Sequence, residues 1–124
     1  MKTENIIADK SKTFAIRIIR LYQHLETKNK GFILSKQLLR SGTSIGANVK
    51  ESVYAQSTKD FISKLKISLK EANETEYWLE LLVATEYITE NEFSSIHADC
   101  VELIKILISI INSSNNNKTD ETEQ

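Results

Sequence analysis

The sequence predicts an all-α protein, an antiparallel up-down-up-down four-helix bundle. Three observations predict it. The 124 residues contain no proline and only three glycines, so few residues interrupt a helix. Apolar residues recur with the 3.6-residue helical period in four successive segments. The connections between these segments are short, and short connections favour antiparallel neighbours.

The first helix is expected over about residues 5–28. Asn29-Lys30-Gly31 follows it and supplies a C-terminal stop of the left-handed kind that glycine permits. Its apolar face consists of Phe14, Ile18, Leu21, Tyr22 and Leu25.

The second helix is expected over about residues 32–56, although its middle contains residues that disfavour helix. Gly42 and Gly46 lie there among three hydroxyl residues. A sequence keeps such residues within a helix where another backbone comes close, or where a polar side chain has a specific partner. This segment therefore predicts a helix-packing seam. The apolar stripe around it is Leu34, Leu38, Gly42, Ile45, Val49 and Val53.

Capping boxes open the remaining two helices. Ser57 followed by Asp60 precedes a helix over about 58–86, and Thr89 followed by Glu92 precedes one over about 90–112. The apolar stripe of the last helix ends at Ile111, and residues 113–124 have a polar composition that predicts a disordered tail. Residues 1–112 therefore form the predicted bundle domain.

The outer sides of the first and last helices are more apolar than a monomer requires. Ile16 and Ile19 widen the apolar arc of the first helix. Exposed patches of this size favour self-association, while the alternative is a few singly exposed isoleucines. On the last helix the corresponding residues are Val101, Ile106, Ile108 and Ile110.

Charge divides the chain into a basic and an acidic part. Residues 1–70 contain fourteen Lys and Arg against five Asp and Glu, whereas residues 71–124 contain two against twelve. A basic surface can follow the phosphates of nucleic acid, although solvated faces and intersubunit ion pairs are alternatives. The candidate nucleic-acid contacts are Lys10, Arg17, Arg20, Lys36, Arg40 and Lys50.

A second group of polar residues predicts a structural network between the second and third helices. Arg40 is expected to bridge to Glu71 or Glu74 if the two polar sides meet. Such a network would fix helix register rather than catalyse a reaction, and a ligand site is the alternative. Its predicted members are Arg40, Ser44, Asn48, Glu51, Glu71, Glu74 and Trp78.

Known catalytic patterns fit the sequence poorly. Arg17 and His24 have a spacing found in some helical RNA-cutting domains, but Ile18 stands where a polar residue is usual. His97 is expected to be a hydrogen-bonded boundary residue, and a ligand role is the alternative. The sequence thus predicts no enzyme, cofactor, metal or small-molecule substrate.

Location is predicted from the cysteine and from the apolar segments. Cys100 is the single cysteine and lies on an apolar face, as expected of a buried thiol in a reducing compartment. Met1–Asn5 lacks a signal-peptide core, and charged residues interrupt the segment from Val101 to Ile111. A cytoplasmic protein without a membrane span is therefore expected.

Three sequence segments resemble a known family. They are Arg40-Ser-Gly-Thr-Ser-Ile-Gly-Ala-Asn-Val-Lys-Glu-Ser52, Lys59-Asp-Phe-Ile62 and Lys70-Glu-Ala-Asn-Glu-Thr-Glu-Tyr-Trp-Leu-Glu-Leu-Leu82. Together they resemble the bacterial four-helix bundle proteins related to those encoded by intervening sequences in large-subunit ribosomal RNA genes. Some relatives have Ala-Glu-Gly where this chain has Lys50-Glu51-Ser52.

This resemblance implies an up-down bundle that assembles into a homopentameric ring. A family similar in fold, the accessory variability proteins of diversity-generating retroelements, works with a reverse transcriptase and nucleic acid. The expected function is therefore a non-enzymatic oligomer that binds RNA, DNA or a nucleoprotein through its basic N-terminal half. The alternative is a protein scaffold without nucleic-acid binding.

Overall fold

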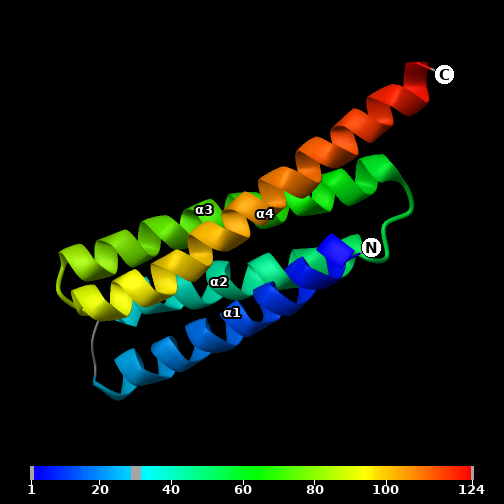
Figure 1. Ribbon diagram of the computed structural model, residues 1–124. Coiled ribbons are helices and arrows are strands. Elements are labelled where there is room, and N and C mark those ends of the chain that lie inside the picture. Colours follow the sequence, from blue (N-terminus) through cyan, green and yellow to red (C-terminus); the bar gives the residue numbers. More distant parts are fainter. Residues whose placement is uncertain (1, 29–31, 124) are drawn as a thin grey trace.

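The computed structural model describes residues 2–28 and 32–123, which form four α-helices (Figure 1). In order they are α1 (Lys2–Thr27), α2 (Phe32–Ser52), α3 (Thr58–Ala84) and α4 (Glu90–Glu123). No strand occurs in these two ranges. The predicted all-α class and the number of helices are confirmed.

The helices pack side by side around a common centre. Within the described ranges, α2 contacts α1 and α3, and α4 contacts α3 and α1. The contact between α2 and α3 is the most extensive, and the contact between α1 and α4 is the least. In Figure 1 the end of α3 and the start of α4 lie at one end of the bundle, and the connection between α2 and α3 lies at the other end.

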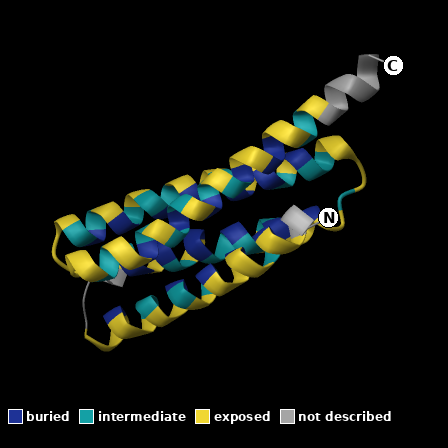
Figure 2. Cartoon of the chain, viewed as in Figure 1, coloured by how far each residue is buried: buried dark blue, intermediate teal, exposed yellow. Residues whose placement is uncertain are grey.

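The core runs along the centre of the bundle, where all four helices contribute buried side chains (Figure 2). Phe14 and Ile18 of α1, Ile45 of α2 and Leu65 of α3 are among its largest fully buried residues. Burial in α1 begins earlier than the stripe read from the sequence, because Ile7 and Ser11 are also buried. Leu21 and Tyr22, by contrast, are only half-buried.

The glycines of α2 face α1, and this confirms the predicted packing seam. A Cβ atom on Gly42 would lie 2.8 Å from Cγ1 of Ile18, and one on Gly46 would lie 3.3 Å from the backbone oxygen of Ser11. Two helix backbones approach closely only where side chains between them are absent or small.

Two helices end earlier than the sequence predicted. The predicted end of α2 was residue 56, but the helix ends at Ser52. The amides that follow donate to the carbonyl three residues earlier, as in a 3₁₀ turn; for example, the Tyr54 N–H donates to the Glu51 oxygen at 3.0 Å. Likewise α3 ends at Ala84 rather than 86. Glu86 has a φ of 66°, and the Tyr87 N–H donates to the Leu82 oxygen at 2.9 Å, as in a Schellman motif.

The predicted capping box is half formed at the start of α3 and fully formed at the start of α4. The Asp60 N–H donates to Ser57 Oγ at 3.0 Å, although the Asp60 carboxylate accepts from Gln56 rather than from Ser57. At the start of α4 the box is fully reciprocal. The Glu92 N–H donates to Thr89 Oγ1 at 3.1 Å, and the Thr89 N–H donates to Glu92 Oε1 at 2.8 Å.

The last helix is longer than predicted. It extends to Glu123, past the boundary expected at 112, and Figure 1 shows its C-terminal part projecting beyond the bundle. The apolar stripe nevertheless ends at Ile111. Disorder of 113–124 in solution stays a prediction, and the predicted stop at 29–31 lies outside the described residues.

The surplus apolar residues are only partly exposed. Ile16, Ile19 and Ile108 are exposed, whereas Val101 and Ile106 are half-buried. Ile110 was expected on the outer flank, but it is buried within the core cluster beside Ile111.

None of the described helices combines the length and apolar character that crossing a membrane requires.

Candidate functional site

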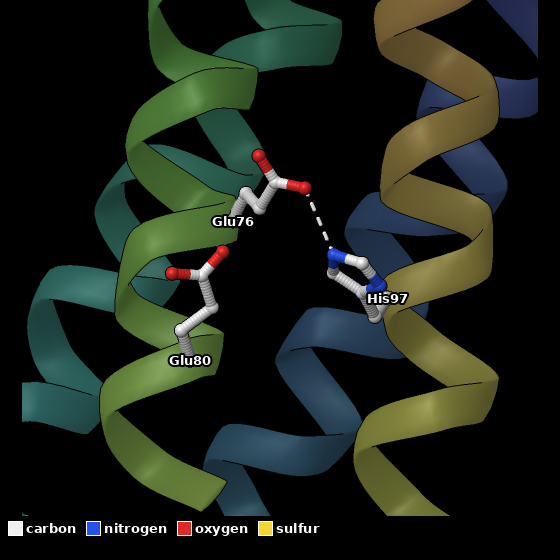
Figure 3. A group of neighbouring side chains, drawn as sticks. All are labelled: Glu76, Glu80 and His97. Carbon is white, nitrogen blue, oxygen red and sulfur yellow. Dashed lines mark hydrogen bonds and ion pairs between the residues drawn. The ribbon is translucent and has the colours of Figure 1, made fainter. Parts of the chain in front are cut away.

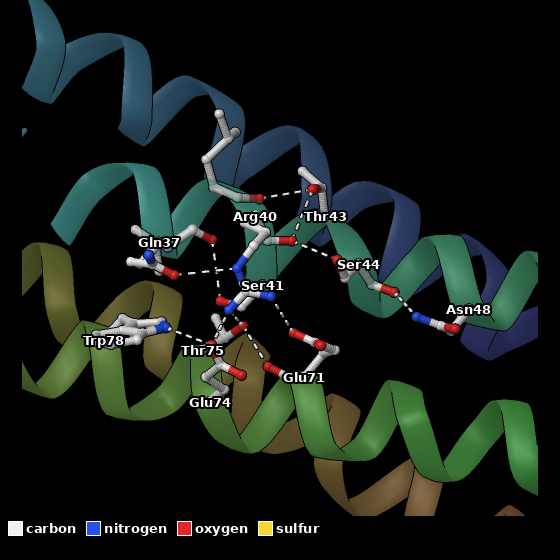
Figure 4. Close-up of polar contacts among 12 residues, drawn as sticks. Gln37, Arg40, Ser41, Thr43, Ser44, Asn48, Glu71, Glu74, Thr75 and Trp78 are labelled. Carbon is white, nitrogen blue, oxygen red and sulfur yellow. Dashed lines mark hydrogen bonds and ion pairs between the residues drawn. The ribbon is translucent and has the colours of Figure 1, made fainter. Parts of the chain in front are cut away.

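The side of the bundle where α2 meets α3 carries the polar network (Figure 4). Arg40 Nη1 donates to Glu71 Oε2 at 3.2 Å, and Nη2 is paired with the carboxylate of Glu74. Arg40 Nε donates to Gln37 Oε1 at 3.2 Å, and Trp78 Nε1 donates to Glu74 Oε1 at 3.3 Å. The guanidinium thus joins two helices through the carboxylates expected from the sequence.

The other predicted members form contacts of a different kind. Ser44 Oγ donates to the Arg40 carbonyl at 2.7 Å, and Asn48 Nδ2 donates to the Ser44 carbonyl at 2.8 Å, both one turn back on α2. Glu51 pairs with Lys64 of α3 at 3.3 Å. None of these bonds connects Ser44, Asn48 or Glu51 to Arg40's carboxylate partners.

Buried hydroxyl groups hold the same two helices together beneath this network. Thr75 Oγ1 lies 2.9 Å from Ser41 Oγ, and Ser68 Oγ donates to the Ile45 carbonyl at 2.8 Å. All three hydroxyl residues are buried. The network predicted from the sequence did not include Ser41, Ser68 or Thr75. The signal was the seven-residue spacing of Ser68 and Thr75 on one helix face.

The cations of α1 face acidic residues of α4. Lys10 Nζ lies 3.1 Å from Glu102 Oε1, and Arg17 Nη1 lies 2.5 Å from Asp99 Oδ2. His24 Nε2 lies 4.0 Å from Glu92 Oε2. We call these three pairs the α1–α4 ladder. Two predicted nucleic-acid contacts, Lys10 and Arg17, are therefore already paired within the chain.

The remaining predicted nucleic-acid contacts are scattered. Arg20 lies on α1, Lys36 near the start of α2 and Lys50 near its end, and all three are exposed. Arg40 belongs to the polar network. The structure therefore does not bring the six predicted cations together into one surface.

A more compact basic surface lies on α3. Lys59, Lys66 and Lys70 are exposed and line one groove with Ile62, Ser63, Ile67 and Asn115. The groove has a volume of about 490 Å³. Within the described part of the chain, none of the three lysines has a carboxylate within ion-pairing distance. We call them the α3 lysine stripe. Sequence reasoning missed it, although the spacing 59, 66 and 70 is helical.

A third polar group lies between α3 and α4 (Figure 3). Glu76 and Glu80 lie on successive turns of α3; Glu76 points toward His97 of α4, and the carboxylate of Glu80 is turned toward Glu76. His97 Nε2 lies 2.8 Å from Glu76 Oε2. One possible metal-ligand atom from each residue lies within 4.8 Å of the others. His97 is half-buried and hydrogen-bonded, as a boundary histidine would be.

Cys100 of α4 has a buried thiol that contacts α3. Its thiol is buried and donates to the Ala72 carbonyl at 3.4 Å. Burial, and secondarily the charge of Glu76, raises the pKa of the Cys100 thiol to about 12. Since the thiolate is the nucleophilic form, Cys100 makes a poor nucleophile at neutral pH.

Comparison with known proteins gives matches in sequence family and in structure. Residues 3–109 match the family described as 23S rRNA-intervening sequence protein. The chain is also similar to a crystal structure of a protein with unknown function from the S23 ribosomal protein family of Bacteroides thetaiotaomicron VPI-5482. The two are 59% identical with a TM-score of 0.87, over 89% of this chain and 98% of the other. No curated protein matches the chain.

Proposed function

Because the chain belongs to the 23S rRNA-intervening sequence protein family, we propose that it is a non-enzymatic, self-associating bundle that binds the phosphate backbone of RNA or DNA. Neither the family's description nor that of the similar structure names a reaction. The binding surface is the α3 lysine stripe, which belongs to the basic half of the sequence.

The observation that carries this proposal is the contrast between paired and unpaired cations. Lys10 and Arg17 lie opposite carboxylates of α4, so phosphate would have to compete with those groups. Lys59, Lys66 and Lys70 face a groove without such competition among the described residues. Unpaired lysines on one helix face are suited to contact successive phosphates, because each contact releases a condensed counterion.

The test is binding of the full chain to a 23S ribosomal RNA fragment and to duplex DNA over a series of salt concentrations. We expect log K to fall linearly with log salt concentration. Replacing the stripe with K59Q/K66Q/K70Q should weaken binding and reduce the slope by about 2 to 3, since each phosphate contact contributes roughly 0.7 to 0.9.

A matched control removes the same charge elsewhere. The variant K12Q/K28Q/K105Q changes three exposed lysines outside the groove and should keep most of the salt slope. Equal loss in both variants would show that net charge alone matters and would contradict the proposed surface. No binding at low salt would exclude the function itself.

We also propose that the helices run antiparallel. The α1–α4 ladder supports this, because its positions rise along α1 from Lys10 to His24 while they fall along α4 from Glu102 to Glu92. Self-association is proposed through the outer sides of α1 and α4, as a closed ring of five copies in the cytoplasm.

A protein scaffold without nucleic-acid binding is the second candidate. It is favoured by apolar side chains at the α2–α3 end, because Val53 and Tyr54 are 63% and 76% exposed. Such residues typically mark a protein contact surface when they lie together. A uniform oligomer that ignores RNA and DNA at low salt would favour this alternative.

A further inference from the structure

We propose that Glu76, Glu80 and His97 form a binding site for one divalent transition-metal ion, such as Zn²⁺, between α3 and α4. The three side chains offer one imidazole nitrogen and two carboxylate oxygens from two packed helices. Borderline ions such as Zn²⁺ accept this donor set, whereas Mg²⁺ and Ca²⁺ prefer oxygen alone.

The donor atoms are close to the geometry that such an ion needs. His97 Nε2 and Glu76 Oε2 are 2.8 Å apart, and one possible ligand atom from each of the three residues lies within 4.8 Å of the other two. Zinc binds nitrogen and carboxylate oxygen at about 2.0 to 2.2 Å, so the ligand atoms of a tetrahedral site lie roughly 3.4 Å apart. The hydrogen-bonded atoms of His97 and Glu76 must therefore separate slightly, and the carboxylate of Glu80 must move closer. Glu80 is exposed, and a change of its rotamer can close this gap.

The imidazole is held in place before any ion arrives. Its ring stacks on Phe93, with centroids 4.6 Å apart and planes inclined by 19°. The side chains of His97 and Glu76 are only 28% and 30% exposed, which partly shields the site from water. Groups that fix a histidine ligand's orientation are a regular feature of metal centres.

The charges of the cluster are incompletely balanced without a cation. Glu76 and Glu80 are four residues apart on α3, and like charges at this spacing repel each other. His97 offsets only one carboxylate, and only when it is protonated. Within the described ranges the side chain of Glu80 makes no hydrogen bond or ion pair. A divalent ion would balance both carboxylates, and three protein ligands would leave a coordination position for water.

The test is titration of the full chain with Zn²⁺ by calorimetry, and with Co²⁺ by visible absorption, which reports the ligand geometry directly. We expect one ion per chain and much weaker binding of Mg²⁺. The variants His97→Ala and Glu80→Gln should each weaken Zn²⁺ binding by at least about tenfold. Glu80→Gln serves as the second variant, because an exposed residue without a partner can change without unfolding the chain.

His24→Ala is the matched control. His24 is the other histidine of the chain, and it also faces a glutamate of α4, Glu92. This variant should bind Zn²⁺ as the unmodified protein does. Absence of saturable binding, or equal affinity in all variants, would overturn the proposal and leave Glu76 and His97 as an ion pair.

Discussion

Gly42 and Gly46 illustrate how the same residue type can tolerate change differently at neighbouring positions. A Cβ on Gly42 would lie within 3.2 Å of three Ile18 side-chain atoms, and Ile18 is fully buried and β-branched. A Cβ on Gly46 would meet the Ser11 backbone at 3.3 Å, a smaller overlap.

We therefore expect Gly42→Ala to destabilise the bundle and Gly46→Ala to be nearly neutral. Overpacking costs about 1 to 3 kcal/mol, and helix propensity returns about 1 kcal/mol in both variants. Denaturant unfolding measures the difference, with Ala47→Gly on the exposed face as the control for propensity alone. Equal stability of the two alanine variants would contradict this account of the seam.

Cys100 should resist alkylation in the native protein. Its pKa of about 12 leaves almost no thiolate at pH 8, and its side chain is buried. We expect iodoacetamide to modify Cys100 only as fast as the chain unfolds, and mass spectrometry can follow this. A Ser94→Cys variant, with the new thiol exposed on the same helix, should be modified rapidly.

Individual residues were predictable where a local rule applies to them. The Thr89 and Glu92 box is decided by sequence spacing, and so are the apolar positions around Phe14. The site was less predictable, because Glu76 and His97 meet only through tertiary packing. Glu86 ends α3 in a conformation that glycine favours, so its residue type gave no signal.

At the scale of a helix, the cap of α4 gives the bundle a defined dependence on pH. The Thr89 N–H holds the pKa of the Glu92 carboxyl below its ordinary value of 4.5, partly opposed by desolvation. A carboxyl with a lowered folded pKa stabilises the native state above its unfolded pKa. This contribution is lost as pH falls through the folded pKa.

We expect the Glu92→Gln variant to lose less free energy of unfolding than the unmodified protein between about pH 5 and pH 3. This pH range surrounds the ordinary pKa of a glutamate carboxyl. The effect should be below about 1 kcal/mol, because the side chain is substantially exposed. Unfolding midpoints at several pH values measure it. Glu90→Gln is the control in the same turn, and an unchanged acid profile in Glu92→Gln would contradict the assignment.

The extents of the helices show what periodicity can decide. Each apolar stripe identified a helix, because a buried face requires the 3.6-residue period. The ends were harder to predict, since hydrogen bonds to individual amides decide them, as in the turn after Ser52. Beyond Ile111 no apolar pattern remains on α4, so the sequence contained no signal for its extension to Glu123.

For the whole molecule, the proposed self-association predicts that replacing an exposed isoleucine by glutamate changes the size of the oligomer only on certain helices. Ile16 on α1 and Ile108 on α4 are 45% and 42% exposed, and Ile67 on α3 is 41% exposed. If the outer sides of α1 and α4 form the contact, Ile16→Glu and Ile108→Glu should lower the mass measured by light scattering. Ile67→Glu should leave it unchanged. Identical masses for all three variants would exclude this interface.

The α1–α4 ladder has a further consequence for the order in which the bundle opens. The two helices share the least extensive contact, and exposed ion pairs across it add only about 0 to 1 kcal/mol each. The contact between α2 and α3 is larger and contains buried hydroxyl bonds. Backbone amides of α1 should therefore exchange with deuterium faster than those of α2 and α3. Added salt screens the ion pairs of the ladder, so it should increase this difference in exchange rate.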